Sequence, residues 1–483
     1  MTTRRSAYGA IGPRAYGAIG LAMLVGLALR IAVARGGLWL DEAWTARFVA
    51  QAGDPIGVLW RINHDNNHFL NSWWMLLVGP YAPPMLVRSL SIATGVASIA
   101  VAGAVGLRRG TATGIIAALL FAVSPIFVAY GAEARGYGPM VLVMLVAILA
   151  IDRWLDGERD APVWTLAVLT LIGMLAQFTY IFALAALGGW IVATRARRMT
   201  FDDAVRGGMR TLAPSIGAVV LVIAVVAAAA RASTTGFQAG GYPGFTMPGF
   251  SAALSDAVVY TLGLSVGAPF ATIAAAAVAV AATILLAPGA MPRRFLYVFA
   301  LLAFPAMLGL ALSRIGNAGF ARYYLVACTA LLLLAADVAG AAIARRGSQR
   351  VVAIAFIAII AAASLSRDYG LAQSLRGDPA RAVTLMRAAA PAGTSVGVDT
   401  IRPTAVLDAA ARTAGYPLDI RQHCPAAAFL FVDLEDRIAA PAALDRCRQH
   451  YARIAVGRYL AMSGFDWALY TRIPPQSGSP AVH

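Results

Sequence analysis

The stretch Gly37–Trp74 reads GLWLDEAWTARFVAQAGDPIGVLWRINHDNNHFLNSWW, and it interrupts a chain dominated by long apolar runs. It holds an acidic pair, Asp41-Glu42, set between tryptophans, followed by two histidines among four asparagines. Charged and amide groups lose their hydration inside a hydrocarbon core, so this stretch does not belong within a bilayer. We therefore predict a polar loop at the membrane surface, held in place by the apolar segments on either side.

The composition of the chain is that of a membrane protein. Of its 483 residues, 60% are hydrophobic and 13% are charged, whereas soluble domains are about 45–50% apolar and about 25% charged. The apolar residues gather in runs long enough to cross a hydrocarbon core of roughly 30 Å. Alternating ten-residue segments, the signature of a membrane barrel, are absent from the sequence. We predict an all-α polytopic membrane protein.

The net charge of +16 comes from arginine, because the sequence contains no lysine. A pI above 10 first suggests nucleic-acid binding. The arginines, however, cluster at the ends of apolar runs, as the positive-inside bias requires. We therefore expect membrane lipids and no nucleic acid as partners. The lysine-free, alanine-rich usage suggests a GC-rich bacterial genome, and hence a bacterial inner membrane.

The arginine clusters also predict how the chain crosses the membrane. Arginines before the first span, about residues 16–33, place the N-terminus in the cytoplasm, and later clusters recur after alternate crossings. The pattern predicts about eleven transmembrane helices in residues 1–366, with an outer loop over residues 35–84. It also places the C-terminus outside.

Residues 367–483 have a different character and predict a small periplasmic α/β domain. TSVGVD, PLDI, AAFLFVD and RIAVGRYL look like short strands between polar helical pieces. Cys424 and Cys447 lie in this region, where an oxidising compartment would let them pair. We predict a disulfide between them, with two free thiols as the alternative.

Asp41 and Glu42 are the first candidates for chemistry. Asp41 could cap a helix that begins at Glu42, since acids are favoured in a first helical turn. Two acids directly after an apolar span are nevertheless costly unless they are used. A carboxylate that an acceptor hydroxyl can reach would serve as a general base.

His64 and His68 are four residues apart, which would place both on one helix face and suit a divalent metal ion. The alternative is that His68 only forms a hydrogen bond across the loop. No cofactor is certain from the sequence, and a divalent metal is the one that it suggests.

Two further groups fall at the outer ends of predicted helices. Glu133 and Tyr137, four apart, would share a helix face with Arg135 turned elsewhere, and Arg322-Tyr323 begins a later span. Paired hydrogen bonds from a guanidinium group suit a phosphate. The alternatives are an ion pair or a lipid headgroup for Arg135, and an aromatic belt for the tyrosines.

The sequence contains no convincing nucleotide fingerprint, phosphate-binding loop or nucleophile elbow. The sequence therefore argues against ATP-driven transport, and we expect the substrate itself to carry the energy.

Four segments together resemble the family 39 membrane glycosyltransferases of the GT-C fold, which include protein mannosyltransferases and enzymes that add aminoarabinose to lipid A. The segments are LDEAWTA at 40–46, HFLN at 68–71, SPIFVAYGAEARGYG at 124–138 and ARYYL at 321–325. Phe69 and Val326-Ala327 replace prolines that are common in the family. Residues 367–483 resemble no family that we can name.

The resemblance implies sugar transfer from a polyprenyl-phosphate carrier to a hydroxyl on the outer face of the membrane, usually with inversion. The acceptor would be a lipid, a glycan or a protein. Asp41 would be the general base. Glu42, the second residue of the catalytic pair, would position the acceptor or a divalent ion together with His68. The donor phosphate would lie against Arg135, Arg322 and Tyr323. The substrate-binding residues would be His68, Asn71, Glu133 and Tyr137.

A lipid-linked sugar flippase is the alternative from a different class. It would place ionisable residues near the middle of the membrane and would often show internal repeats.

Overall fold

The computed structural model describes residues 12–474 apart from 241–243, 265–267, 287–291, 312–316, 346, 423–425, 435–437 and 461. The chain divides into two compact units. The helical unit comprises Met1–Val33, Ile56–Trp73 and Arg88–Tyr369. The sheet unit comprises Ala34–Pro55, Trp74–Val87 and Gly370–His483.

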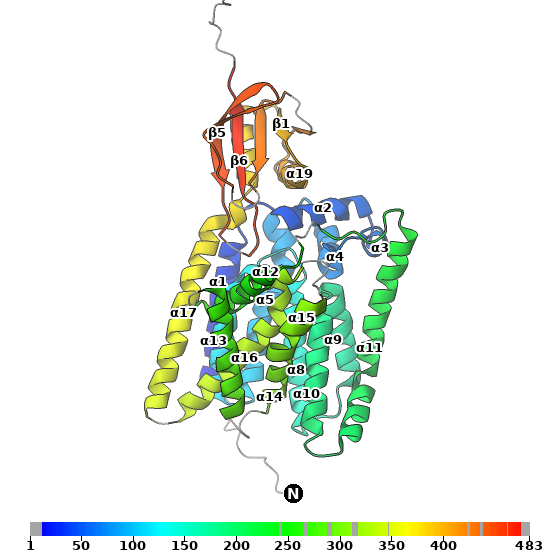
Figure 1. Cartoon of the computed structure of the whole chain (residues 1–483), viewed down its shortest axis with the longest axis vertical. Coiled ribbons are helices and arrows are strands. Elements are labelled where there is room, and N and C mark those ends of the chain that lie inside the picture. The colour runs from blue at the N-terminus through cyan, green and yellow to red at the C-terminus, as the bar shows by residue number, and fades with distance from the viewer. Residues whose placement is uncertain are drawn as a thin grey trace, which may run out of the picture. The chain divides into compact units, whose positions relative to one another are not determined.

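Helices make up the helical unit, and Figure 1 shows α8 to α11 running side by side. In chain order they are α1 (Pro13–Val33), α3 (Pro55–Trp60), α4 (Phe69–Val78), α5 (Pro84–Leu107), α6 (Thr111–Val123), α7 (Pro125–Tyr130), α8 (Tyr137–Leu155), α9 (Val163–Ala176), α10 (Tyr180–Arg195), α11 (Phe201–Ala232), α12 (Met247–Leu262) and α13 (Pro269–Leu286). After these come α14 (Arg294–Tyr297), a π-helix (Val298–Ala303), α15 (Phe304–Ala311), two short 3₁₀ turns (Asn317–Gly319 and Ala321–Tyr324), α16 (Leu325–Ala344) and α17 (Ser348–Ser374). Both α4 and α5 begin or end in the sheet unit, as does α17.

In the described part of the chain, six helices are long and apolar enough to cross a membrane. A further set of apolar helices is shorter, at 10–17 residues. Helices coincide with every predicted span, so the multi-pass membrane architecture is confirmed. The count of about eleven crossings stays a prediction.

The apolar run over residues 113–130 is broken where Ser124 meets Pro125. Ser124 has the extended backbone (ψ 121°) that a residue before proline adopts, and α6 ends there while α7 begins. The Ser124 hydroxyl donates to the Thr261 carbonyl at 2.8 Å, which ties the break to the end of α12. The apolar pattern alone could not show this break, because both pieces are equally apolar.

Close helix contacts in the helical unit rely on small residues. A Cβ at Gly340 of α16 would collide with Thr113 of α6, and one at Gly106 of α5 would collide with the backbone at Gly114. Glycine lets the helix backbones approach, which is how membrane helices gain packing without a hydrophobic driving force between them.

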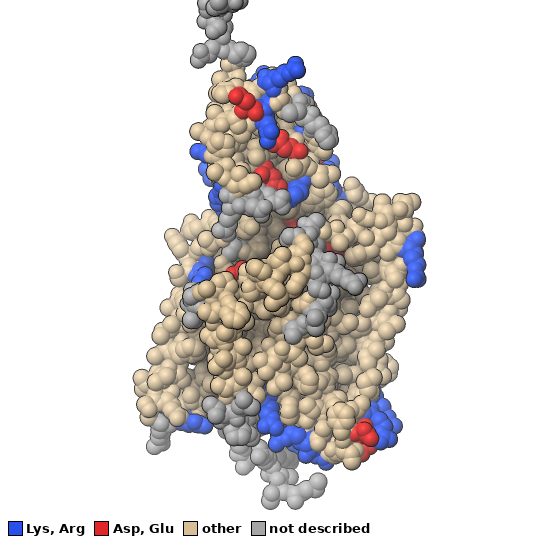
Figure 2. Space-filling view, viewed as in Figure 1, with Lys and Arg blue, Asp and Glu red and all other residues tan. Residues whose placement is uncertain are grey.

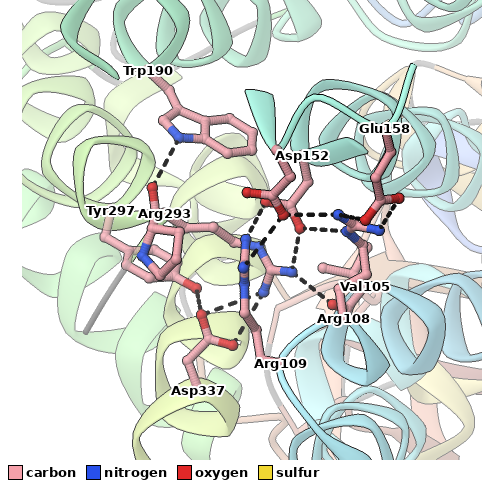
Figure 3. Close-up of polar contacts among 11 residues, drawn as sticks. Val105, Arg108, Arg109, Asp152, Glu158, Trp190, Arg293, Tyr297 and Asp337 are labelled. Atoms are coloured by element: carbon pink, nitrogen blue, oxygen red, sulfur yellow. Dashed lines mark hydrogen bonds and ion pairs between the residues drawn. The ribbon is translucent and has the colours of Figure 1, made fainter. Parts of the chain in front are cut away.

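A network of charged side chains joins the ends of several helices at the basic end of the helical unit (Figure 3). Arg293, fully buried, donates to Asp152 at 2.8 Å and to Asp337 at 3.1 Å. Arg108 donates to Asp152 at 3.0 Å, and its other nitrogens reach Asp156 and Glu158. In Figure 2, arginine side chains gather at the lower end of the helical unit, whereas the middle of the unit in that view is largely uncharged.

Replacing Arg293 with methionine is expected to destabilise the protein by about 3–5 kcal/mol, because it leaves a buried carboxylate without its cation. Asp152 keeps its other arginines, so the loss falls mainly on Asp337. Thermal unfolding in mixed micelles, followed by circular dichroism, measures the effect. Arg206→Met is the matched control, since Arg206 forms an exposed pair with Asp203, and such pairs contribute about 0–1 kcal/mol. Equal shifts for the two variants would contradict the prediction.

The sheet unit contains a six-stranded mixed sheet in the order β2-β1-β3-β6-β5-β4. Its strands are β1 (Thr394–Val398), β2 (Leu418–Gln422), β3 (Phe429–Asp433), β4 (Ala443–Arg446), β5 (Gln449–Gly457) and β6 (Trp467–Arg472). Strands β2, β1 and β3 are parallel, and the remaining pairs are antiparallel. The predicted α/β domain is present, and β4 and β6 are strands that the sequence did not reveal.

The core of the sheet unit explains why part of the predicted outer loop belongs to it. Helices α18 (Ala380–Ala389) and α19 (Arg402–Ala414) bury apolar faces against Phe431 and Trp467. Helix α2 (Leu40–Ala52) packs on α19, with Leu40 against this core and Arg47 donating to the Thr404 hydroxyl at 2.9 Å. The predicted boundary between the two domains lay between residues 366 and 367. In the structure the sheet unit also includes Ala34–Pro55 and Trp74–Val87, and its last segment begins at Gly370.

Cys447 is disulfide-bonded and has a left-handed backbone, with φ at 59°. Cys424, its predicted partner, lies outside the described residues, so the pairing stays a prediction. Cys328 is a buried free thiol.

Candidate active site

The loop before α4 is held by asparagine side chains and by a segment far along the chain. The Asn67 side chain donates to the carbonyls of Val58 and Ile62 at 2.9 and 3.2 Å. Gln238 pairs with the loop through its backbone, donating to Asn63 at 2.7 Å and accepting from Asp65 at 3.0 Å. The glycine-rich segment after α11 is therefore an ordered partner of this loop at Gln238.

This loop is not helical, which corrects the expectation that His64 and His68 share a helix face. His64 lies in a bridge to Gln238, and its Nδ1 accepts from the Asn66 backbone N–H at 3.0 Å. The Asn67 backbone N–H then donates to the His64 carbonyl at 3.0 Å. Asparagine side chains and turns compete with helical hydrogen bonds here, so a spacing of four carries no helical meaning.

His68 is buried directly before α4, and its ring is neutral. Burial lowers the pKa of His68 well below its usual 6.5, and the charges of Arg135 and Arg322 lower it further. Its Nδ1 lies 3.1 Å from the Ala176 carbonyl, which can only accept, so Nδ1 carries the hydrogen. Nε2 is then a buried acceptor, and it has no partner among the described residues.

Residues 131–136 form a sequence of turns, which corrects the expectation of a helix face shared by Glu133 and Tyr137. Tyr137 is the first residue of α8. A Cβ at Gly136 would collide with the Ala176 carbonyl, the same oxygen that His68 contacts. Glycine is thus required where this turn meets the end of α9.

This turn brings together Arg135 and Tyr137, which were predicted to lie on different faces of a helix. The Arg135 guanidinium lies over the Tyr137 ring at 5.5 Å, and it donates to the Asn66 side chain. The His68 and Tyr137 rings meet edge to face at 5.4 Å. Glu133, Arg135 and Tyr137 are all buried.

Arg322 arrives from a distant part of the chain, in the 3₁₀ turn before α16. Its guanidinium lies over Phe320 at 4.6 Å and over Tyr323 at 5.6 Å, and it is buried. The Tyr323 hydroxyl accepts from the Asn317 amide at 3.0 Å. Because Arg135 and Arg322 both lower the pKa of His68, two guanidinium charges converge on one imidazole.

Two more buried polar atoms near this turn can accept a hydrogen bond. The Asn71 amide donates to the Ala134 carbonyl, and its Oδ1 is buried with no partner in the described part of the chain. The Tyr137 hydroxyl is likewise buried without a described partner. With His68 Nε2, these atoms can receive hydrogens from a bound molecule that carries hydroxyl groups.

Asp41 and Glu42 lie in the sheet unit, in the first turn of α2. This helix begins at Leu40 with Trp39 as its N-cap, so Asp41 is not the cap. The buried Glu42 carboxylate accepts from the Trp39 backbone N–H at 3.3 Å. The structure thus gives Glu42 a role in starting the helix, while the Asp41 side chain is half-buried.

No family model and no curated protein sequence matches the chain. Among solved structures, ArnT from Cupriavidus metallidurans, crystallised with undecaprenyl phosphate, has a TM-score of 0.53 at 12% identity, covering 96% of this chain and 99% of ArnT. An oligosaccharyltransferase from Archaeoglobus fulgidus, tethered to an acceptor peptide, has a TM-score of 0.40 at 13% identity and covers 84% of this chain and 63% of that protein. The match to ArnT spans nearly the whole length of both proteins.

The chain has the GT-C fold. This confirms the fold that the four sequence segments implied. Three of those segments supply the buried cluster in the helical unit: HFLN gives His68 and Asn71, the Glu133–Tyr137 turn follows α7, and ARYYL gives Arg322. The fourth supplies Asp41 in the sheet unit.

A metal site in this GT-C chain is still only predicted. Over the described residues, no group of three or more histidine, cysteine, aspartate or glutamate side chains could hold a metal ion. The Nδ1 of His64 lies 2.9 Å from Asp65 Oδ1. His64 and His68 therefore remain candidates without a third ligand.

Sequence reasoning missed several buried polar residues of the helical unit, and Asn66 and Arg30 are two of them. Asn66 accepts from Arg135 and so fixes the guanidinium, yet an asparagine in a polar loop gives no signal of that role. Arg30 is buried in α1 and donates to the carbonyls of Gly26 and Phe121 at 3.0 and 3.2 Å. An arginine inside an apolar span was a signal that could have been used.

Proposed function

We propose that this protein is a glycosyltransferase that moves a sugar from a polyprenyl-phosphate carrier to a hydroxyl acceptor on the outer face of a bacterial inner membrane. The observation that carries the proposal is the convergence of Arg135 and Arg322 on a neutral His68. Two buried guanidinium groups suit a phosphate. A neutral imidazole beside them adds no third positive charge and offers an acceptor instead.

In the proposed reaction the oxygen of the acceptor hydroxyl attacks C1 of the sugar, and the bond from C1 to the phosphate oxygen breaks. The phosphate leaves with the electron pair, and Arg135 and Arg322 stabilise the negative charge that develops on it. Asp41 takes the proton of the acceptor hydroxyl. Attack opposite the leaving phosphate inverts the configuration at C1.

The buried acceptors His68 Nε2, Asn71 Oδ1 and Tyr137 OH would receive hydrogen bonds from the sugar hydroxyls. An acceptor left unsatisfied in a buried site is destabilising by about 1–3 kcal/mol. A polyhydroxyl ligand removes this penalty and an apolar one does not. The proposal is supported by the likeness in fold to ArnT, whose crystal structure is bound to undecaprenyl phosphate.

A transporter for the lipid-linked sugar is the second candidate, and one observation favours it. Arg30, Arg88 and Asp368 are buried in α1, α5 and α17, each within about two turns of a helix end and not at the middle of its helix. Ionisable residues buried in membrane helices often mark a translocation path.

One assay distinguishes the two functions. The purified protein is reconstituted into liposomes with radiolabelled polyprenyl-phosphate hexose or pentose, and an envelope extract supplies acceptors. A transferase releases free polyprenyl phosphate as label enters the acceptor fraction. Movement of the intact labelled carrier between leaflets, without release of polyprenyl phosphate, would establish the transporter and refute the transferase.

A further inference from the structure

A large cavity lies in the helical unit between α6, α13, α16 and α17. Its volume is 1110 Å³, and apolar side chains line most of its wall, among them Leu334, Val338, Val352 and Phe356. Along α16 the lining extends from Leu331 to Arg345. At 1.5 Å per residue this is about 21 Å, which exceeds half of the roughly 30 Å hydrocarbon core. The cavity is thus deep enough for the acyl chains of one leaflet.

One end of the cavity is polar. Arg345, Ser348 and Gln349 line it there, where α16 ends and α17 begins. The first backbone N–H groups of α17 have no partner within the helix, and its dipole favours an anion at this end. A cavity with apolar walls and this polar end would suit an amphiphile with a negatively charged headgroup.

Arg345 is a cation that lines the cavity at this end. Its polar partner in the described structure is the Gln349 side chain, at 3.1 Å, and it forms no ion pair with a described carboxylate. Arg108 and Arg109, which also line the cavity, are bound to Asp152. Figure 3 shows Arg109 within this network.

Asp337, the carboxylate among the described lining residues, does not oppose an anion. Asp337 accepts from Arg293 at 3.1 Å and from the Tyr297 hydroxyl at 2.5 Å, so its charge is already matched. The cavity therefore combines apolar walls with a guanidinium group that has no ion pair with a described carboxylate.

We propose that this cavity binds an anionic phospholipid, with its phosphate on Arg345 and the first turn of α17 and its acyl chains along α16. Basic pockets between membrane helices recognise anionic headgroups in this way. The site lies apart from the residues proposed for sugar transfer, because none of His68, Arg135 and Arg322 lines it.

The test is native mass spectrometry of the delipidated full-length protein, titrated with dioleoyl phosphatidylglycerol and, separately, with dioleoyl phosphatidylcholine. We expect tighter binding of phosphatidylglycerol, and a loss of about tenfold in its affinity in Arg345→Gln, as for one charged hydrogen bond. Phosphatidylcholine should bind this variant and the wild type alike. The matched control is Arg350→Gln, five residues away and outside the cavity lining, which should leave both affinities unchanged.

Val338→Trp fills the apolar wall from a partly exposed position and should weaken the binding of both lipids. Equal affinity of the wild type for the two lipids would overturn the proposal, as would equal losses in Arg345→Gln and Arg350→Gln. Displacement of phosphatidylglycerol by millimolar inorganic phosphate would also overturn it, because the site would then bind a free anion. None of these measurements depends on transferase activity.

Discussion

Asp41→Asn is expected to lower the rate of sugar transfer by about 10²- to 10⁴-fold, the usual contribution of a general base. Asparagine has the shape of aspartate but cannot take a proton from an acceptor hydroxyl. Asp41 is half-buried in the first turn of α2 and does not cap the helix, so the fold should tolerate the change. Release of polyprenyl phosphate at saturating donor measures the rate, and circular dichroism confirms folding.

Two variants make this result specific. Asp54→Asn removes a half-buried acid from the same predicted outer loop. It should leave the rate within about threefold, because the amide keeps the shape of the side chain and Asp54 is not among the residues proposed for sugar transfer. Glu42→Gln alters the carboxylate that receives the Trp39 N–H, so it should lower thermal stability more than it lowers turnover. Full transfer by Asp41→Asn, or an equal loss in Asp54→Asn, would remove Asp41 from the mechanism.

Arg322→Ala is expected to raise the KM for the polyprenyl-phosphate donor and to lower kcat, with kcat/KM falling by about 10²- to 10³-fold, the effect of removing one donor to a developing oxyanion. Arg322→Lys keeps the charge but loses the planar paired geometry and the stacking over Phe320, so it should recover only part of the loss. Initial rates over a range of donor concentrations separate the two constants.

Arg231→Ala is the matched control, because Arg231 is an exposed arginine at the end of α11. It should leave both kinetic constants unchanged. An unchanged donor KM in Arg322→Ala would place the phosphate elsewhere, and a similar loss in Arg231→Ala would point to a general effect of charge on carrier binding.

The membrane architecture could be predicted from the sequence because burial in a bilayer imposes long apolar runs. Helix α1, for example, begins at Pro13, close to the predicted start of the first span at about residue 16. Strands β4 and β6 could not be predicted. β4 reads ALDR and is largely exposed, so it lacks the alternating pattern of a half-buried strand. β6 reads WALYTR and is buried on both faces over its first four residues, which removes the alternation in the opposite way.

The candidate site was predicted as a set of residues and not as a geometry. His68, Arg135, Tyr137 and Arg322 could be named because charged and aromatic groups at helix ends are costly without a role. Their backbone conformation could not be predicted, because both arguments from a shared helix face assumed a regular helix across segments that are turns in the structure. The role of the Ala176 carbonyl, which fixes the His68 tautomer, depends on a tertiary contact that no local pattern encodes.

The polypeptide passes between its two units at five points, after residues 33, 55, 73, 87 and 369. A single cut in the chain would therefore not separate the sheet unit from the helical unit. A chain ended at residue 366 would retain α2 but lose α19 and the Trp467 core on which α2 is built. A change in the composition of that core would then alter the packing of Leu40, the neighbour of Asp41, although the core lies more than three hundred and forty residues further along the sequence. Selection for sugar transfer and selection for a folded C-terminal region would act on the same contacts.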